Sequence, residues 1–456
     1  MKRLNFQDAP LAIPTVSRRL ADGTLVELVY DNKGKHTKLA VGKGNDVTLH
    51  DKYACADGTF LTPYSATNNL IKHEVVLLAA HLEVFRSVTE LVTKIEAYID
   101  RYVDLGDGFR TLASYYILLT WVYDAFNELP YLRFRGDYGS GKTRALLVIG
   151  SLCHKAFFAS GASTISPIFH TLDTFRGTLI FDEADFRFSD EKAELVKIFN
   201  NGNVKGFPVL RTAVTQKKEF EPRAFNVFGP KVVAMRRSFE DQALESRFFT
   251  EEMGKQSLRP DIPISLPDCQ KDEALALRNE LLAYRFAMLP TLSAHETLVD
   301  PLLSPRLNQI LVPLLSIVEG TDRRRAISDV VQGFDKSFHT GQHASIEGTL
   351  VSVLAELLTV AVASVSVGEI TAQLLDRARE YTDRPLTTRH VGYILRTRLG
   401  IATTRRHGTY VVLGSERSKL TELCLRYGAV IPAATPNTPK REEGKAEHPP
   451  ATPTPV

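Results

Sequence analysis

One segment, Gly136-Asp137-Tyr138-Gly139-Ser140-Gly141-Lys142-Thr143, matches the pattern G-x-x-x-x-G-K-[ST] at every specified position. Residues 131–134 before it are typical of a strand, and residues 144–152 continue as an apolar helix. Glycines let such a backbone bend around an anion, so that successive N–H groups point at it from the helix N-terminus. Lys142 would then bind nucleotide phosphates, and the Thr143 hydroxyl would bind Mg²⁺. We predict an ATP-binding loop that uses Gly136, Gly139, Ser140, Gly141, Lys142 and Thr143, rather than a glycine-rich turn with an incidental lysine.

A second segment, residues 177–183, is an apolar strand that ends in Asp182 and Glu183. We predict that Asp182 binds Mg²⁺ together with Thr143, and that Glu183 polarises the water that attacks the γ-phosphate. An acidic pair can also begin a solvated loop, but this pair follows a complete phosphate-binding loop by about forty residues. The two segments together predict an ATP hydrolase with ATP and Mg²⁺ as its ligands.

The letters Asp182-Glu183-Ala184-Asp185 resemble a DEAD-box motif, but the interval from Lys142 is too short, and no Ser-Ala-Thr motif follows. The spacing is instead similar to that of AAA+ ATPases. Residues 231–235 resemble the next core strand of that family, which places Arg236 or Arg237 where the family senses the γ-phosphate, usually with Asn.

The resemblance to AAA+ ATPases covers about residues 110–330. Residues 241–248 look like the segment that carries the arginine finger, which implies that Arg247 reaches the site of a neighbouring subunit. A structural ion pair is the alternative role for Arg247. Arg306 is a weaker candidate for the second sensor.

An additional segment lies between the acidic motif and the 231–235 strand. Residues 207–215 and 219–227 predict two strands around a turn with Lys217 and Lys218. Superfamily 3 helicases, and the helicase parts of phage and plasmid primase–helicases, have a hairpin here whose basic tip enters the ring pore. The resemblance implies DNA-backbone contacts for Lys217 and Lys218; a surface hairpin with solvated lysines is the alternative.

The C-terminal region resembles a winged-helix domain. Residues 367–380 and 385–399 predict two helices, the second with Thr387 as its N-cap, and residues 403–413 predict a hairpin. Val391, Ile394 and Leu395 form the expected buried face of the second helix. The resemblance implies DNA contacts from Arg389, Arg396, Arg405 and Arg406, unless this domain binds protein instead.

Charge and composition agree with a protein that contacts a polyanion locally. The 456 residues carry a net charge of +3, but residues 205–237 and 384–413 carry +6 each, so the remainder is acidic. The four cysteines are too dispersed for a disulfide framework or a zinc site. No stretch is apolar enough to span a membrane and no signal segment is visible, so we expect a cytoplasmic protein.

The expected fold class is α/β, with an AAA+ P-loop core made of a parallel sheet and flanking helices. The domain boundaries that we predict are a β-rich region (1–68), a helical region (69–130), the ATPase core (131–255), a helical lid (256–340), a winged helix (341–425) and a disordered Pro-rich tail (426–456).

Taken together, these features predict an ATP-driven DNA helicase or translocase of a phage, plasmid or other mobile-element replication system. It would act as a homo-oligomeric ring, expected to be a hexamer, with DNA as its partner. Two alternatives stay open: an AAA+-like regulatory switch, and a loader or remodelling ATPase that does not unwind DNA.

Overall fold

The computed structural model describes residues 12–182, 190–214, 220–239, 241–254, 259–343, 346–360, 363–377 and 386–429. The chain divides into two compact units, Met1–Asp335 and Lys336–Val456. The division falls inside the helix α10 (Thr321–His343). Among the described residues, no helix is both long and apolar enough to cross a bilayer. The predicted tail lies outside these residues, except for residues 426–429, of which Arg426 and Tyr427 belong to the last helix.

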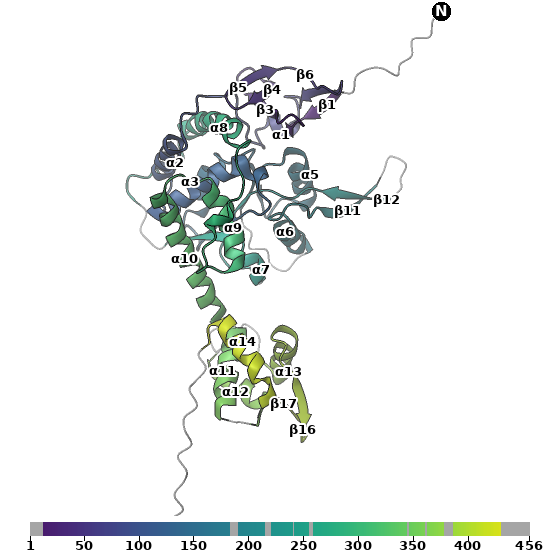
Figure 1. The fold of residues 1–456 in the computed structure, drawn as a ribbon, viewed down its shortest axis with the longest axis vertical. Coiled ribbons are helices and arrows are strands. Elements are labelled where there is room, and N and C mark those ends of the chain that lie inside the picture. Colours follow the sequence, from purple (N-terminus) through teal and green to yellow (C-terminus); the bar gives the residue numbers. More distant parts are fainter. Residues whose placement is uncertain are drawn as a thin grey trace, which may run out of the picture. The chain divides into compact units, whose positions relative to one another are not determined.

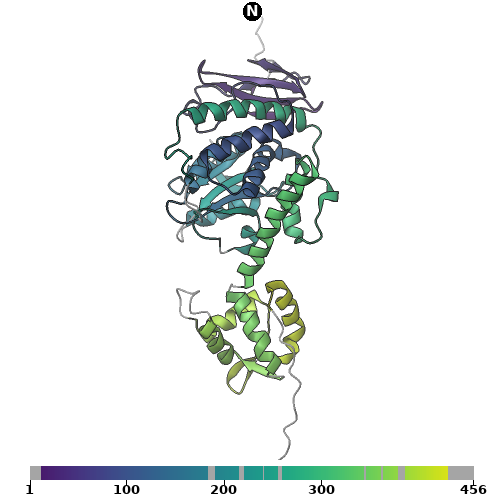
Figure 2. The same ribbon diagram turned by 90° about the vertical axis from the view of Figure 1, so that its left-hand side faces the viewer.

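The first unit begins with two small sheets, drawn in purple in Figures 1 and 2. Their strands are β1 (Ala12–Thr15), β2 (Ser17–Arg19), β3 (Leu25–Asp31), β4 (His36–Lys43), β5 (Asp46–His50), β6 (Tyr53–Ala54) and β7 (Phe60–Pro63). One sheet has the order β1-β7-β6 and the other the order β2-β3-β4-β5. The hairpin predicted around residues 31–34 is confirmed, because β3 pairs antiparallel with β4.

The next region is only partly the helical block that the sequence predicts. Its helices are α1 (Asn69–Lys72), α2 (Val88–Tyr102), α3 (Asp107–Val122) and the 3-10 turn η1 (Tyr123–Ala125). Residues 73–87 are not helical, which corrects the expectation for this stretch. Leu77 donates its N–H to Ala156 O, and Ala79 O accepts from Tyr30 N. In this stretch, the apolar residues at three- and four-residue spacing therefore belong to a non-helical chain that bridges two sheets.

A five-stranded parallel sheet forms the centre of the unit. Its strands are β8 (Tyr131–Arg135), β9 (Phe157–Ser160), β10 (Leu179–Asp182), β13 (Lys231–Met235) and β14 (Phe248–Glu252), in the spatial order β14-β8-β13-β10-β9. The connecting helices are α4 (Lys142–Gly150), α5 (Ile165–Phe175), α6 (Asp190–Asn201) and α7 (Gln242–Glu245). The predicted α/β core with a parallel sheet is confirmed at this level.

Alternation along the strands explains why both faces of this sheet are covered. In β8, Leu132 and Phe134 belong to the core that includes α3 and α4, whereas Tyr131 belongs to the core that includes α5 and α6. Successive side chains of a strand point to opposite faces, so apolar residues at both parities require helices on both sides.

A two-stranded ribbon, β11 (Val209–Val214) and β12 (Phe220–Phe225), extends away from the core (Figure 1). Arg211 and Glu194 of α6 form an ion pair, and the Arg211 guanidinium lies 4.0 Å from the centre of the Phe169 ring. The predicted pair of strands is confirmed. Its turn, which contains Lys217 and Lys218, lies outside the described residues.

The remaining elements of the first unit are α8 (Cys269–Met288), the 3-10 turn η2 (Glu296–Leu298), α9 (Pro305–Ser316) and most of α10. α8 packs against α2, α3 and β4, and α9 packs against α3. The role of this region as a lid over a nucleotide stays a prediction.

A buried ionic network joins the N-terminal sheet to this helical layer. Glu27 of β3 accepts from Arg285 Nε of α8 at 2.8 Å and lies 2.6 Å from Lys155 Nζ. Burial opposes the charge of Glu27, but Arg285 and Lys155 lower the pKa of this carboxyl well below its usual range. Arg285 also pairs with Asp124 at 2.8 Å. The buried apolar residues of the N-terminal strands belong to the same two cores as the parallel sheet, so these strands are part of the first unit.

The second unit contains α11 (Ile346–Val360), β15 (Ser364–Ser366), α12 (Val367–Arg377), α13 (Thr388–Tyr393), the π-helical turn η3 (Ile394–Arg398), β16 (Thr403–Arg406), β17 (Thr409–Leu413), the 3-10 turn η4 (Gly414–Glu416) and α14 (Arg417–Tyr427). The strands pair in the order β15-β17-β16. Thr387 caps α13, since its side chain accepts from His390 N, and Val391, Ile394 and Leu395 are fully buried. These local predictions are confirmed.

Candidate nucleotide-binding site

The predicted phosphate-binding loop joins β8 to α4 at the carboxyl edge of the parallel sheet. A Cβ atom on Gly136 would lie 2.6 Å from Met253 O and 2.8 Å from Ser140 Oγ, so only glycine fits this approach. Gly139 and Gly141 have φ angles of 72° and 88°, which glycine adopts without strain. The three glycines are therefore required by the backbone geometry of the loop.

Lys142 lies inside this loop. Its ammonium group donates to Gly136 O at 2.6 Å, Asp137 O at 2.5 Å and Ser140 Oγ at 3.2 Å. α4 begins at Lys142, so the positive end of the helix dipole points to the same place. A cation, a helix N-terminus and a glycine-rich backbone together fit the phosphates of a nucleotide.

Thr143 and Asp182 meet below the loop. Thr143 Oγ1 donates to Asp182 Oδ2 at 2.8 Å, which joins the first turn of α4 to the end of β10. A cavity of about 300 Å³ lies beside the pair and is lined in part by Leu147 and Ser160. Mg²⁺ in nucleotide sites needs only one or two protein oxygens besides phosphates and water. The residues present therefore fit ATP with Mg²⁺.

Three predicted site residues belong to parts of the chain that the structure does not describe. Glu183 follows Asp182 directly but lies outside the described residues, and so do Lys217 and Lys218. Their roles stay predictions.

The end of β13 adjoins the phosphate-binding loop, as the resemblance implies. Gly136 N donates to Met235 O at 3.3 Å. The guanidinium of Arg236, the next residue, lies 3.6 Å from the centre of the Tyr138 ring. Arg236, one of the two sensor candidates, therefore contacts the loop itself. Sequence reasoning did not single out Tyr138, although its place inside the glycine-rich motif was a signal.

Arg247 lies at the amino edge of the same sheet, directly before β14 begins. Its backbone oxygen accepts from Tyr131 N at 2.8 Å, beside the first residue of β8. Its guanidinium donates to Asn200 Oδ1 and Asn203 Oδ1, both at 2.9 Å, and to Ala243 O at 2.6 Å. Burial lowers the pKa of Arg247, and the positive charge of a neighbouring arginine adds to this effect.

Strand direction separates Arg247 from the loop of its own chain. β8 and β14 are parallel, with Phe248 beside Tyr131 and Glu252 beside Arg135. Five residues at about 3.3 Å each place the two edges roughly 16 Å apart. Arg247 therefore cannot contact a nucleotide in its own loop.

Arg306 is the weaker candidate, proposed for the second sensor. Burial lowers its pKa, and the nearby Tyr131 and Glu128 oppose this shift, so Arg306 lies near the amino edge of β8, as Arg247 does. Its role as a second sensor stays a prediction. Its helix, α9, follows α3 along that side of the sheet, an arrangement that depends on distant contacts.

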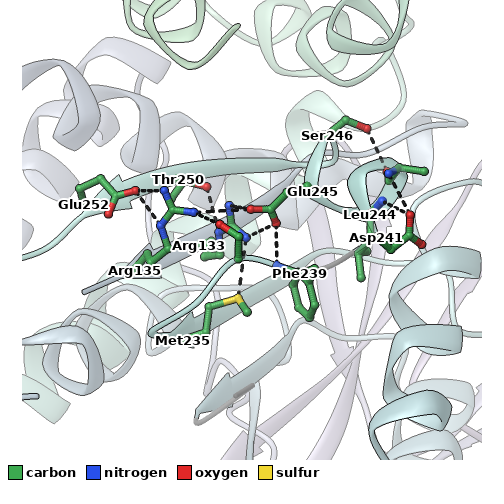
Figure 3. Close-up of polar contacts among 12 residues, drawn as sticks. Arg133, Arg135, Met235, Phe239, Asp241, Leu244, Glu245, Ser246, Thr250 and Glu252 are labelled. Atoms are coloured by element: carbon green, nitrogen blue, oxygen red, sulfur yellow. Dashed lines mark hydrogen bonds and ion pairs between the residues drawn. The ribbon is translucent and has the colours of Figure 1, made fainter. Parts of the chain in front are cut away.

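An ion-pair network links the strand before the loop to the segment that carries Arg247 (Figure 3). The Glu245 carboxylate of α7 accepts from both terminal nitrogens of Arg133, at 2.5 and 2.7 Å, and from Phe239 N at 3.2 Å. Arg135, which precedes the loop directly, donates to Glu252 at 2.7 Å through Nε. Arg133 is almost fully buried, so its bidentate partner is required for stability. Sequence reasoning missed this network, because each of its two arginine–glutamate pairs joins residues more than a hundred positions apart.

The basic segment of residues 205–237 does not form one exposed surface. Lys231 is fully buried, and its ammonium group donates to Val227 O and Gly229 O, both at 2.9 Å. Arg211 and Arg223 form ion pairs with Glu194 and Asp173. Lys205 donates to Asp124 O at 3.2 Å, so these four basic residues of the segment have structural partners.

In the second unit the four predicted arginines are all exposed. Arg389 lies on α13 and Arg396 on η3, while Arg405 and Arg406 lie on β16. Arg396 donates to Thr403 Oγ1 at 3.0 Å, which joins the helix to the hairpin.

No protein-family description and no curated protein matches the sequence. Among solved structures, the apo C-terminal region of NrS-1 aligns at 13% identity over 85% of this chain and 96% of that one, with a TM-score of 0.34. JCV helicase aligns at 13% identity over 57% and 64%, with a TM-score of 0.23. The Aeropyrum pernix ORC1 protein in complex with DNA aligns at 14% identity over 70% and 92%, with a TM-score of 0.19. TM-scores of this size establish neither fold nor function, so the assignments below rest on residues and geometry.

Proposed function

We propose that this chain is an ATP-hydrolysing subunit of a ring-shaped DNA helicase or translocase, which serves the replication of a mobile element such as a phage or plasmid. One observation supports this proposal most directly: the Thr143–Asp182 pair and Arg247 lie at opposite edges of one sheet. A nucleotide site at one edge can therefore receive this arginine only from a second copy of the chain. Such a head-to-tail contact closes into a ring, here proposed as a hexamer.

Each residue of the site has a separate duty in this proposal. Lys142 binds the β- and γ-phosphates, and Thr143 with Asp182 holds Mg²⁺, which neutralises charge on the phosphate oxygens. Glu183 orients and polarises the attacking water. Arg247 of the adjacent subunit stabilises negative charge that develops on the transferred group.

The ribbon β11–β12 offers a route from hydrolysis to DNA. α6 is the first described element after the acidic motif, and its Glu194 pairs with Arg211 of β11. A displacement of α6 during hydrolysis would therefore move the ribbon. We propose that Lys217 and Lys218 at its turn contact backbone phosphates, which requires no sequence recognition.

The second unit supplies a separate DNA-binding module. Its order of helix, strand, helix, helix and hairpin supports the winged-helix interpretation, with α13 and η3 as the recognition helix and β16–β17 as the wing. Arg389, Arg396, Arg405 and Arg406 are the proposed DNA contacts.

A DNA-stimulated ATPase assay followed by strand displacement on a forked substrate tests the proposal. Stimulation together with displacement supports a helicase. Stimulation without displacement favours the loader or remodelling ATPase, and slow hydrolysis that DNA does not change favours the regulatory switch.

A further inference from the structure

Arginine and tyrosine alternate along the exposed face of the helix formed by α13 and η3. Arg389, Tyr393 and Arg396 follow one another at four- and three-residue spacing, opposite to the buried face of this helix. The Tyr393 side chain is 49% exposed, so it contributes little to the core of the unit.

The hairpin continues this pattern on one of its two faces. Arg405 pairs with Tyr410 and Thr403 pairs with Val412, so these four side chains share a face. Val412 is fully buried, which shows that this face points toward the helix. Arg396 confirms the direction, because it donates to Thr403 Oγ1 and its guanidinium carbon lies 5.8 Å from the centre of the Tyr410 ring.

Arg406 belongs to the opposite face. It pairs with Thr409, one position from the Arg405–Tyr410 pair, and successive side chains of a strand alternate between faces. Two adjacent exposed arginines therefore point in different directions, and Arg405 shares its face with Thr403 and Tyr410, which contact Arg396.

We infer that the helix–hairpin surface, defined as Arg389, Tyr393, Arg396, Arg405 and Tyr410, binds nucleic acid at a place where bases are unpaired, as at the junction of a fork. This inference rests on the proposed function as far as DNA is the ligand. Residues 386–413 contain no Asp or Glu, so the surface complements a polyanion. Exposed tyrosine rings add a contact that phosphates alone do not use, since aromatic rings stack on bases whose faces are accessible. In an intact duplex those faces are covered by neighbouring base pairs.

The test uses the full-length chain and fluorescence anisotropy on a fork, a single strand and a blunt duplex, across a salt series. Arg405→Ala should reduce the salt dependence of fork binding by about one unit of slope, as expected for one lost phosphate contact. Arg426→Ala is the matched control, because Arg426 is an exposed arginine of α14 outside this surface, and this variant should bind as the wild type does. Tyr410→Ala should weaken fork and single-strand binding about tenfold, Tyr410→Phe should preserve it, and neither should change blunt-duplex binding.

A loss for Arg426→Ala as large as that for Arg405→Ala would overturn the assignment of DNA binding to this surface. A loss for Tyr410→Ala that is as large on blunt duplex as on the fork would overturn the preference for unpaired bases. If the wild type shows DNA-stimulated hydrolysis while all these variants bind DNA normally, the surface is not the site and the proposed function stands. If the wild type binds none of the three DNAs and DNA does not stimulate its ATPase, the proposed function itself fails.

Discussion

We expect Lys142 and Glu183 to have separable duties, because in the proposed mechanism one binds the substrate and the other acts only during hydrolysis. Glu183→Gln should leave ATP binding nearly intact and reduce turnover by about 10² or more, the scale of general-base catalysis. Lys142→Ala should instead lose ATP binding, since its ammonium group is the loop's contact for phosphates. Nucleotide-binding titrations and steady-state ATPase rates measure the two effects. A Glu183→Gln protein with wild-type turnover would exclude Glu183 from the chemistry.

Lys231 makes a prediction about pH and stability. Burial lowers its pKa to about 7, whereas an exposed lysine titrates near pH 10.4. Between these values the unfolded chain binds more protons than the folded chain, so the free energy of unfolding attributable to Lys231 rises with pH. The slope is at most about 1.4 kcal/mol per pH unit. Relative to a Lys231→Met variant, the wild type should therefore gain stability from pH 7 to pH 9.

Denaturant unfolding of both proteins at several pH values measures this difference. Parallel stability curves would show that Lys231 stays charged in the fold, held by the carbonyl oxygens of Val227 and Gly229.

At the scale of elements, the ribbon β11–β12 is expected to couple hydrolysis to DNA movement. Its strands are fixed to α5 and α6 by Arg223 and Arg211, and the ribbon extends away from the core (Figure 1). Lys217→Ala combined with Lys218→Ala should abolish strand displacement and DNA stimulation of the ATPase. Basal hydrolysis and duplex binding at low salt should persist, because neither the nucleotide site nor the second unit is altered.

The matched control for the ribbon is the exposed hairpin turn between β3 and β4. Lys33→Ala combined with Lys35→Ala removes the same charge from that turn and should not affect strand displacement. Normal strand displacement by the Lys217/Lys218 variant would contradict the pore-hairpin proposal and favour the loader or the switch.

At the scale of the whole molecule, the two edges of the sheet predict a site shared between copies. Arg247→Ala subunits retain the phosphate-binding loop, and Lys142→Ala subunits retain the arginine, so each variant alone should be inactive. In a randomly mixed ring about one interface in four joins an intact loop to an intact arginine, because head-to-tail contacts pair different surfaces. ATPase activity should therefore recover to about that fraction of the wild-type rate.

The control for subunit mixing replaces the second partner with a Lys142→Ala/Arg247→Ala double variant, which supplies no arginine and should recover nothing. Absence of recovery at every ratio, in rings shown to be mixed, would mean that Arg247 serves only the fold through Asn200, Asn203 and Ala243.

Local features of this chain could be predicted from its sequence. The phosphate-binding loop is eight contiguous residues, whose glycines and helix start depend on near neighbours alone. The strand that ends in Asp182 and the cap at Thr387 are likewise set by short-range patterns. Contiguous motifs carry their own geometry, because the backbone that surrounds the ligand is the motif itself.

Only the tertiary structure decided features that depend on which strands and helices become neighbours. The extended course of residues 73–87 follows from pairing with β3 and β9, although their apolar spacing is that of a helix. The positions of Arg247 and Arg306 at the edge away from the loop follow from strand direction and helix packing. The different orientations of Arg405 and Arg406 follow from the register of one hairpin. Sequence patterns report local conformation and burial, whereas these relations are fixed by contacts between residues far apart in the chain.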